Sequence, residues 1–170
     1  MTRDLYRRII ESFVVGDGTI YHAGKTCNIF ATDVCDALQT PLKRQDNGRA
    51  YDCQNLLPLL SNIYLSWRPA GFGSEEAKNF QMAQMAANTG KTVVAITYDH
   101  IALVRPNESG SIPNNIKDVS IAQAGGNPST NTTIAWGWPE GRHNEIEFYI
   151  WQGTLMSNAD AEEYLRNKGA

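Results

Sequence analysis

Apolar residues recur at intervals of three and four residues along much of the first half of the chain, a spacing that gathers them on one face of a helix. The predicted helices cover residues 2–13, 27–38, 56–65 and 74–88. Ser74 caps the last of these at its start, and Gly90 ends it. Pro58 is tolerated because we expect it in the first turn of its helix.

After Gly90 the pattern changes to short runs that are rich in β-branched and aromatic residues, which favours strands. The predicted strands cover residues 92–98, 101–104, 119–124, 132–136 and 145–151. A loop over 124–131 and a short final helix over 157–165 complete the pattern. Because helices come first and strands afterwards, we predict an α+β fold in which N-terminal helices pack on an antiparallel sheet.

Length and charge narrow the classes of function. The 170 residues suit one domain, and we expect a single domain over 1–170. The formal net charge of -3 gives no sequence-wide argument for binding nucleic acid or an anionic membrane. No run of apolar residues is long enough to cross a bilayer, and the first residues do not lead into the apolar segment of a signal peptide.

Three cysteines are too few for a disulfide framework, and their number is odd. Two interpretations of Cys35 and Cys53 stay open. They bridge in an oxidising compartment, or they are two buried and inert thiols. The remaining cysteine, Cys27, differs from the other two because it stands at the start of a predicted helix.

Cys27 stands at the start of the predicted helix 27–38, where unpaired amide groups and the helix dipole favour a thiolate. A nucleophilic cysteine also needs a nearby imidazole, and the chain offers His22, His100 and His143. We rank His100 first because it begins a predicted strand, where a rigid sheet holds its ring.

Four segments together resemble the CHAP and NlpC/P60 group of papain-like peptidoglycan amidases and endopeptidases. They are Cys27-Asn28-Ile29-Phe30, residues 88–95, His100 to Pro106, and Ile121 to Gly125. The resemblance covers about residues 20–151. Its specificity lies in the order of a helix-borne cysteine, a strand-borne histidine and a polar position on the following strand.

The resemblance implies a papain-like fold and assigns roles to particular residues. Cys27 is the expected nucleophile, and His100 is the expected general base and then the acid that protonates the leaving amine. Gln123 is the best candidate for the third member, which fixes the imidazole tautomer, with Asp118 and Asn127 as alternatives. Gln departs from the family, which usually has Glu, Asn, Asp or His there, and it would stabilise an imidazolium less than a carboxylate does.

The main-chain amide of Cys27 is the natural first donor of an oxyanion hole, and Tyr21 is expected to add a hydroxyl. Asn28 is a second candidate for oxyanion or substrate binding. Asp99 precedes His100 where the family often has Gly, and the link from Thr97 to His100 is unusually tight for a hairpin.

By this resemblance the protein hydrolyses an amide bond of the cell-wall stem peptide through a thioester. An enzyme made in the cytoplasm without a signal peptide must be delivered to the periplasm or wall. We therefore expect an antibacterial effector of a type VI secretion system or a phage lysin. Its partners are bacterial peptidoglycan and, for an effector, an immunity protein, with no nucleic acid and no membrane.

Two other functions remain open. One is a deamidase or transglutaminase-like toxin that acts on a protein, and the other is a non-catalytic binding domain in which Cys27 is buried and inert. We expect no cofactor, because a zinc site built from Cys27, Cys53 and the histidines lacks ligand pairs at metal spacing. Several aromatic residues could line a sugar groove, although aromatic residues in strands are more often core. They are Trp67, Trp136, Trp138, Tyr149 and Trp151.

Overall fold

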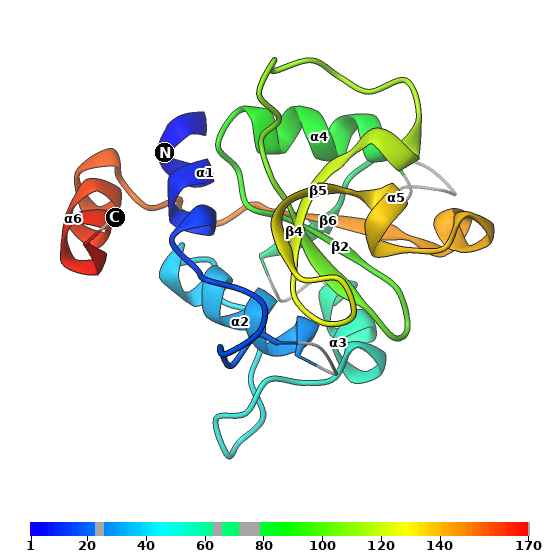
Figure 1. Cartoon of the computed structure of the whole chain (residues 1–170), viewed down its shortest axis with the longest axis horizontal. Helices are drawn as coiled ribbons and strands as arrows, with labels where there is room; N and C mark the ends of the chain where they lie inside the picture. The colour runs from blue at the N-terminus through cyan, green and yellow to red at the C-terminus, as the bar shows by residue number, and fades with distance from the viewer. Residues whose placement is uncertain (23–25, 63–65, 72–78, 170) are drawn as a thin grey trace.

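The structure is a computed structural model that describes residues 1–22, 26–62, 66–71 and 79–169. Within these residues six strands form one sheet in the order β1-β6-β2-β3-β4-β5, and all neighbouring strands are antiparallel. The strands are β1 (Trp67–Pro69), β2 (Val93–Ile96), β3 (Ile101–Val104), β4 (Ser120–Gln123), β5 (Ser129–Thr133) and β6 (Glu147–Trp151). Figure 1 shows helices around this sheet. The predicted α+β class with an antiparallel sheet is confirmed.

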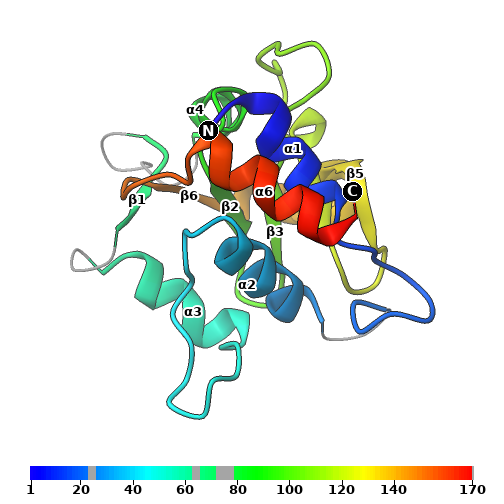
Figure 2. The ribbon, with the colours of Figure 1, turned by 90° about the vertical axis from the view of Figure 1, so that its left-hand side faces the viewer.

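Helices from both ends of the chain cover the sheet. They are α1 (Arg3–Glu11), α2 (Cys27–Ala37), α3 (Cys53–Leu60), α4 (Phe80–Asn88), α5 (Ile134–Gly137) and α6 (Asn158–Lys168), with 3₁₀ turns η2 (Ile116–Asp118) and η3 (Glu140–Glu145). Helix α2 packs against β3 and β4, and α4 packs against β2, β3 and β6. Helices α1 and α6 lie side by side, as Figure 2 shows.

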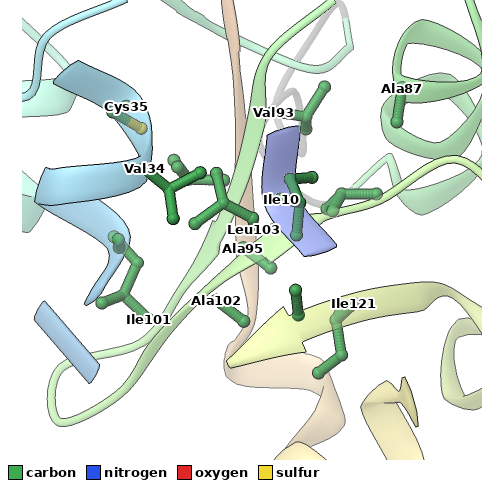
Figure 3. Packing of buried hydrophobic residues seen from close by; sticks show 14 of the residues in the cluster. Ile10, Val34, Cys35, Ala87, Val93, Ala95, Ile101, Ala102, Leu103 and Ile121 are labelled. Carbon is green, nitrogen blue, oxygen red and sulfur yellow. The ribbon is translucent and has the colours of Figure 1, made fainter. Parts of the chain in front are cut away.

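The core sits where these helices meet the central strands. Every residue of β2 and β3 is buried, so both faces of the sheet are covered at its centre. Figure 3 shows Val34 of α2 pointing toward the strands, in the same cluster as Leu103 of β3 and Ile10 of α1. Each such aliphatic side chain stabilises the fold by ~1.5–3 kcal/mol when fully buried.

The helix predicted over 56–65 begins earlier than expected. It starts at Cys53, because the Asp52 side chain accepts a hydrogen bond from the Asn55 amide. Pro58 therefore lies in the interior of α3, which ends at Leu60, and not in its first turn.

The helix predicted over 74–88 is described from Phe80, where Asn79 caps it by accepting from the Met82 amide. The predicted cap Ser74 lies outside the described residues. The end of this helix is as expected, since Gly90 has a φ of +83°. A Cβ at Gly90 would lie 2.2 Å from the main-chain oxygen of Met1, so glycine is also needed there for space.

The strand predicted over 132–136 is wrong at both ends. The strand is β5, which starts within the predicted loop 124–131, and α5 takes the place of its predicted second half. Ile134 and Trp138 are both buried, whereas Trp136 is 68% exposed. Two buried positions four residues apart fit the helical period, while a strand would have placed Ile134 and Trp136 on one face.

The segment Trp67–Pro69, for which we predicted no strand, forms the short edge strand β1 beside β6. Trp67 is buried there and pairs with Trp151 across the two strands. A three-residue strand that ends in proline shows no alternation in the sequence, so its pairing depends on contacts made by distant residues.

Candidate active site

Helix α2 presents Cys27 as its first residue. Its buried face includes Cys27, Phe30, Ala31 and Val34, so the sulfur points inward toward the sheet. The hydroxyl of Thr26 donates to the carbonyl of His22 and does not cap the helix. The sulfur thus lies at the positive end of the helix dipole, where a thiolate is favoured.

His100 lies directly before β3, in the tight link from β2. This link closes as a hairpin, because the Thr97 amide donates to the His100 carbonyl over 2.8 Å and β2 pairs with β3. Cys27 and His100 line the same cleft, and each of them shifts the pKa of the other. The start of β3 and the start of α2 therefore meet at this cleft, where α2 packs against β3.

Gln123, the last residue of β4, holds the other side of the imidazole. Its Oε1 is 2.9 Å from Nε2 of His100, and an amide oxygen only accepts, so Nε2 carries the proton. The Gln123 Nε2 donates to the main-chain oxygen of Asn127 over 2.8 Å, which fixes the orientation of the amide. The remaining nitrogen of His100, Nδ1, is thus left to face Cys27.

Trp138 packs against the same imidazole. Its ring and the His100 ring have centroids 4.6 Å apart and an interplanar angle of 62°. The indole Nε1 donates to Thr97 Oγ1 over 3.0 Å, and that hydroxyl donates to Asp99 Oδ1 over 3.0 Å. The hairpin that carries His100 is therefore braced by a buried aromatic ring.

Asp99 is held at the surface by Arg142, which donates to its two oxygens over 2.8 and 2.9 Å. These hydrogen bonds lower the pKa of Asp99, so its carboxylate stays charged. The charge of Asp99 adds to the influences that raise the pKa of His100.

Cys53, the first residue of α3, lies against Cys27 with 4.0 Å between the two sulfur atoms. The sequence pointed instead to a bridge between Cys35 and Cys53 or to two inert thiols. In the structure all three cysteines are free thiols, and Cys35 packs in the core. Cys53 is the site residue that the sequence did not reveal, because no local pattern links position 53 to position 27.

The hydrogen bond with Cys53 is the largest influence on the pKa of Cys27 and lowers it. Burial acts in the opposite direction, and the hydrogen bond and charge of His100 add to the lowering. The pKa of Cys27 is therefore well below that of an ordinary thiol. The hydrogen bond to Cys27 and burial raise the pKa of Cys53. Cys53 therefore stays a thiol, and its S–H group donates a hydrogen bond to the Cys27 thiolate.

Burial alone would lower the pKa of His100, because an imidazolium loses its water. The hydrogen bond and charge of Cys27, together with the hydrogen bond of Gln123, outweigh burial and raise the pKa of His100. At pH values between the lowered pKa of Cys27 and the raised pKa of His100, both shifts favour a thiolate on Cys27 and an imidazolium on His100.

An open cleft of about 360 Å³ gives access to this pair. It is lined by Cys27, Asn28, Asp52, Cys53, Gln54, Tyr98, Asp99, His100, Gly125 and Gly126. Cys27 is nearly covered, with 7% of the residue exposed, but it is one of the residues that line the cleft. A reactant can thus reach the sulfur through the cleft.

Asn28 and Tyr21, the two predicted oxyanion or substrate-binding residues, lie in different places. Asn28 lines the cleft, and its Nδ2 donates to the main-chain oxygen of Tyr51 over 2.9 Å. The hydroxyl of Tyr21 instead donates to Asp33 over 2.8 Å, and its ring packs against Phe30. The described residues that line the cleft do not include Tyr21, so its expected role is corrected.

The described residues that line the cleft do not include the other histidines or the alternative third members. His143, in η3, is bonded through Nε2 to the main-chain oxygen of Trp138, and His22 does not line the cleft. Asp118 lies in η2, while Asn127 offers its main-chain oxygen to Gln123. Among the described residues, no group of three or more histidine, cysteine and acidic side chains is arranged to hold a metal ion.

The proposed aromatic groove is not assembled. Trp67, Trp138 and Tyr149 are buried in the core, while Trp136 is exposed. The site therefore combines the Cys27 thiol and the His100 imidazole in one cleft, with the Gln123 amide bonded to the imidazole. This set of groups suits nucleophilic attack on an acyl carbon, with proton transfer by the histidine.

No protein-family model matches the chain, and no curated protein matches it either. In the part of the chain that the structure describes, none of the helices has the length and apolar character needed to cross a membrane.

Proposed function

We propose that the protein is a papain-like cysteine hydrolase, of the CHAP and NlpC/P60 kind, that cleaves an amide bond in the stem peptide of bacterial peptidoglycan. The observation that carries the proposal is that Cys27 and His100 line one cleft, while the buried Gln123 hydrogen-bonds to His100 behind it. The resemblance in the sequence supplies the substrate class.

In the proposed reaction the Cys27 thiolate attacks the carbonyl carbon of the substrate amide. The main-chain amide of Cys27, at the start of α2, stabilises the oxyanion of the tetrahedral intermediate. His100 gives its Nδ1 proton to the leaving amine, and a thioester remains. His100 then takes a proton from water, which hydrolyses the thioester and releases the acid.

Gln123 supports this cycle without touching the substrate. Its Oε1 accepts from Nε2 of His100, so Nδ1 is kept toward the sulfur in both protonation states. Because Gln is neutral, the imidazolium is stabilised mainly by the Cys27 thiolate.

We further propose that the enzyme is delivered to the periplasm or wall, as a type VI secretion effector or a phage lysin. For an effector, a cognate immunity protein would cover the Cys27 cleft. Co-purification from the producing strain tests this part, and repeated failure to find a protein that covers the cleft counts against an effector.

Cleavage of purified sacculi tests the main proposal. The wild-type protein should release soluble stem-peptide fragments, which mass spectrometry identifies by the bond broken. Cys27→Ala should abolish release. Cys35→Ala is the matched control, because Cys35 lies on the same helix but in the core, and it should retain cleavage.

Undiminished cleavage by the Cys27→Ala variant would overturn the proposal. A parallel assay with protein glutamine substrates separates wall hydrolysis from deamidation or transglutamination. Ammonia release from those substrates, with no fragment from sacculi, would assign the same cysteine to the alternative chemistry.

A further inference from the structure

Cys53 places a second sulfur in the cleft beside the nucleophile. The two sulfur atoms are 4.0 Å apart, and both residues line the cleft. Each is the first residue of its helix, and the Asn28 side chain ties the start of α2 to the main chain of Tyr51, close to the start of α3. The contact is therefore made where the first residues of two helices meet.

We propose that Cys27 and Cys53 form an oxidation site, in which a peroxide oxidises Cys27 and Cys53 resolves the product to a reversible disulfide. This inference goes beyond the proposed hydrolase function, because it needs only the two sulfur atoms and the cleft. The disulfide would occupy the nucleophile and so switch off any reaction that begins with the Cys27 thiolate.

The distance permits the bond after a small movement. A disulfide joins its sulfurs at about 2.05 Å, so the two atoms must approach by roughly 2 Å. A change in the side-chain rotamers of Cys27 and Cys53 moves the sulfurs without moving a strand of the sheet.

The chemistry balances in two steps. The Cys27 thiolate attacks one oxygen of the peroxide, the O–O bond breaks, and the sulfur becomes a sulfenic acid while the other oxygen leaves with a proton as water or an alcohol. The Cys53 sulfur then attacks the Cys27 sulfur. Hydroxide leaves with the Cys53 proton as water, and the S–S bond forms. A dithiol reductant restores both thiols by exchange.

The two cysteines differ in the way that this order requires. The pKa of Cys27 is lowered, so it is the thiolate that meets the peroxide first, whereas the pKa of Cys53 is raised and it stays a thiol. Cys35 is neither the oxidised nor the resolving cysteine, because none of its surface is exposed and it packs in the protein core from α2.

Intact-mass spectrometry of the full chain after hydrogen peroxide treatment tests the proposal. The wild type should lose two hydrogen atoms, and a digest without reductant should yield one peptide pair joined through Cys27 and Cys53. Reduction with dithiothreitol should restore the original mass. The matched control Cys35→Ser should show the same loss, because its substituted residue lies outside the cleft.

In Cys53→Ser, Cys27 has no resolving partner, so peroxide should add oxygen atoms to Cys27 and no loss of hydrogen should appear. The proposal is overturned if the wild type gains only oxygen, if the bridge joins Cys35, or if it joins two chains. These readouts do not depend on hydrolysis, so they stay informative even if sacculi are not cleaved.

Discussion

The two ends of α2 carry the same side chain in opposite surroundings. Cys27, at the first residue, meets His100, Cys53 and the open cleft. Cys35, near the last turn, is enclosed in the core, and burial raises its pKa. One helix therefore holds a thiol prepared for reaction and a thiol that behaves as a small apolar residue.

The difference teaches which contacts make a cysteine reactive. Both sulfurs are more than nine-tenths covered, so burial does not separate them. What separates them is the set of donors within reach. Cys27 hydrogen-bonds with Cys53 and lines the same cleft as His100, and the influence of these two residues outweighs the effect of burial on its pKa.

Alkylation against pH should give the largest contrast. Because the pKa of Cys27 is lowered, its thiolate persists as the pH falls through the ordinary thiol value of about 8.5 and disappears only at the lower pKa. Iodoacetamide should label Cys27 rapidly at acidic pH and leave Cys35 unlabelled until the protein unfolds. Peptide mapping checks both sites. An inflection near the ordinary value would contradict the proposed thiolate.

Replacing His100 by Asn should have the next largest effect. Loss of the general base should reduce the rate of sacculus cleavage by about 10²–10⁴-fold. The alkylation inflection of Cys27 should also move to higher pH, because a donor and a positive charge are lost. His22→Asn is the control, since His22 does not line the cleft, and equal losses in the two variants would remove His100 from its assigned role.

Gln123→Ala should have a smaller effect on the same reaction. It removes a hydrogen bond to a charged ring, worth about 1.5–3 kcal/mol, so kcat should fall by roughly 10- to 150-fold. Gln123→Glu keeps the acceptor and adds a negative charge, which should raise the pKa of His100 further and move the alkaline limb of the pH profile upward. A profile that is the same in all three proteins would leave Gln123 a structural residue.

Cys35→Ala should show the smallest effect, and on stability alone. Removing a buried sulfur should lower the free energy of unfolding by about 1–2 kcal/mol. Urea unfolding measures this change, and the alkylation profile of Cys27 should stay unchanged. A shift in that profile would mean that the two ends of α2 are coupled.

Local pattern predicted the regular elements well where they contribute many apolar residues to the core. Helices α1 and α2 and strands β2, β3 and β6 lie where their apolar residues placed them. It did worse at the edges of the sheet, because β1 and β5 are short or polar and depend on pairing with distant strands. Asp52, a residue type that often caps helices, is the local signal that marks the true start of α3.

The site divides in the same way. The order of Cys27, His100 and Gln123 was sufficient to choose three residues that the fold brings together. Cys53 was not found, since a contact between the first residues of two separate helices leaves no periodic signal. Tyr21 was misplaced because nearness along the chain was taken for nearness in space, whereas Asp33 holds its hydroxyl.

The short helix α5 has a consequence for which amino acids position 123 can accept. A Cβ on Gly137 would lie 2.6 Å from Oε1 of Gln123, so the turn leaves room for a hydrogen atom and for nothing larger. The close approach of residue 137 therefore limits the size of the side chain that can hold the imidazole. Glutamate has the same shape as glutamine and fits this space, whereas a histidine ring at position 123 would require α5 to move.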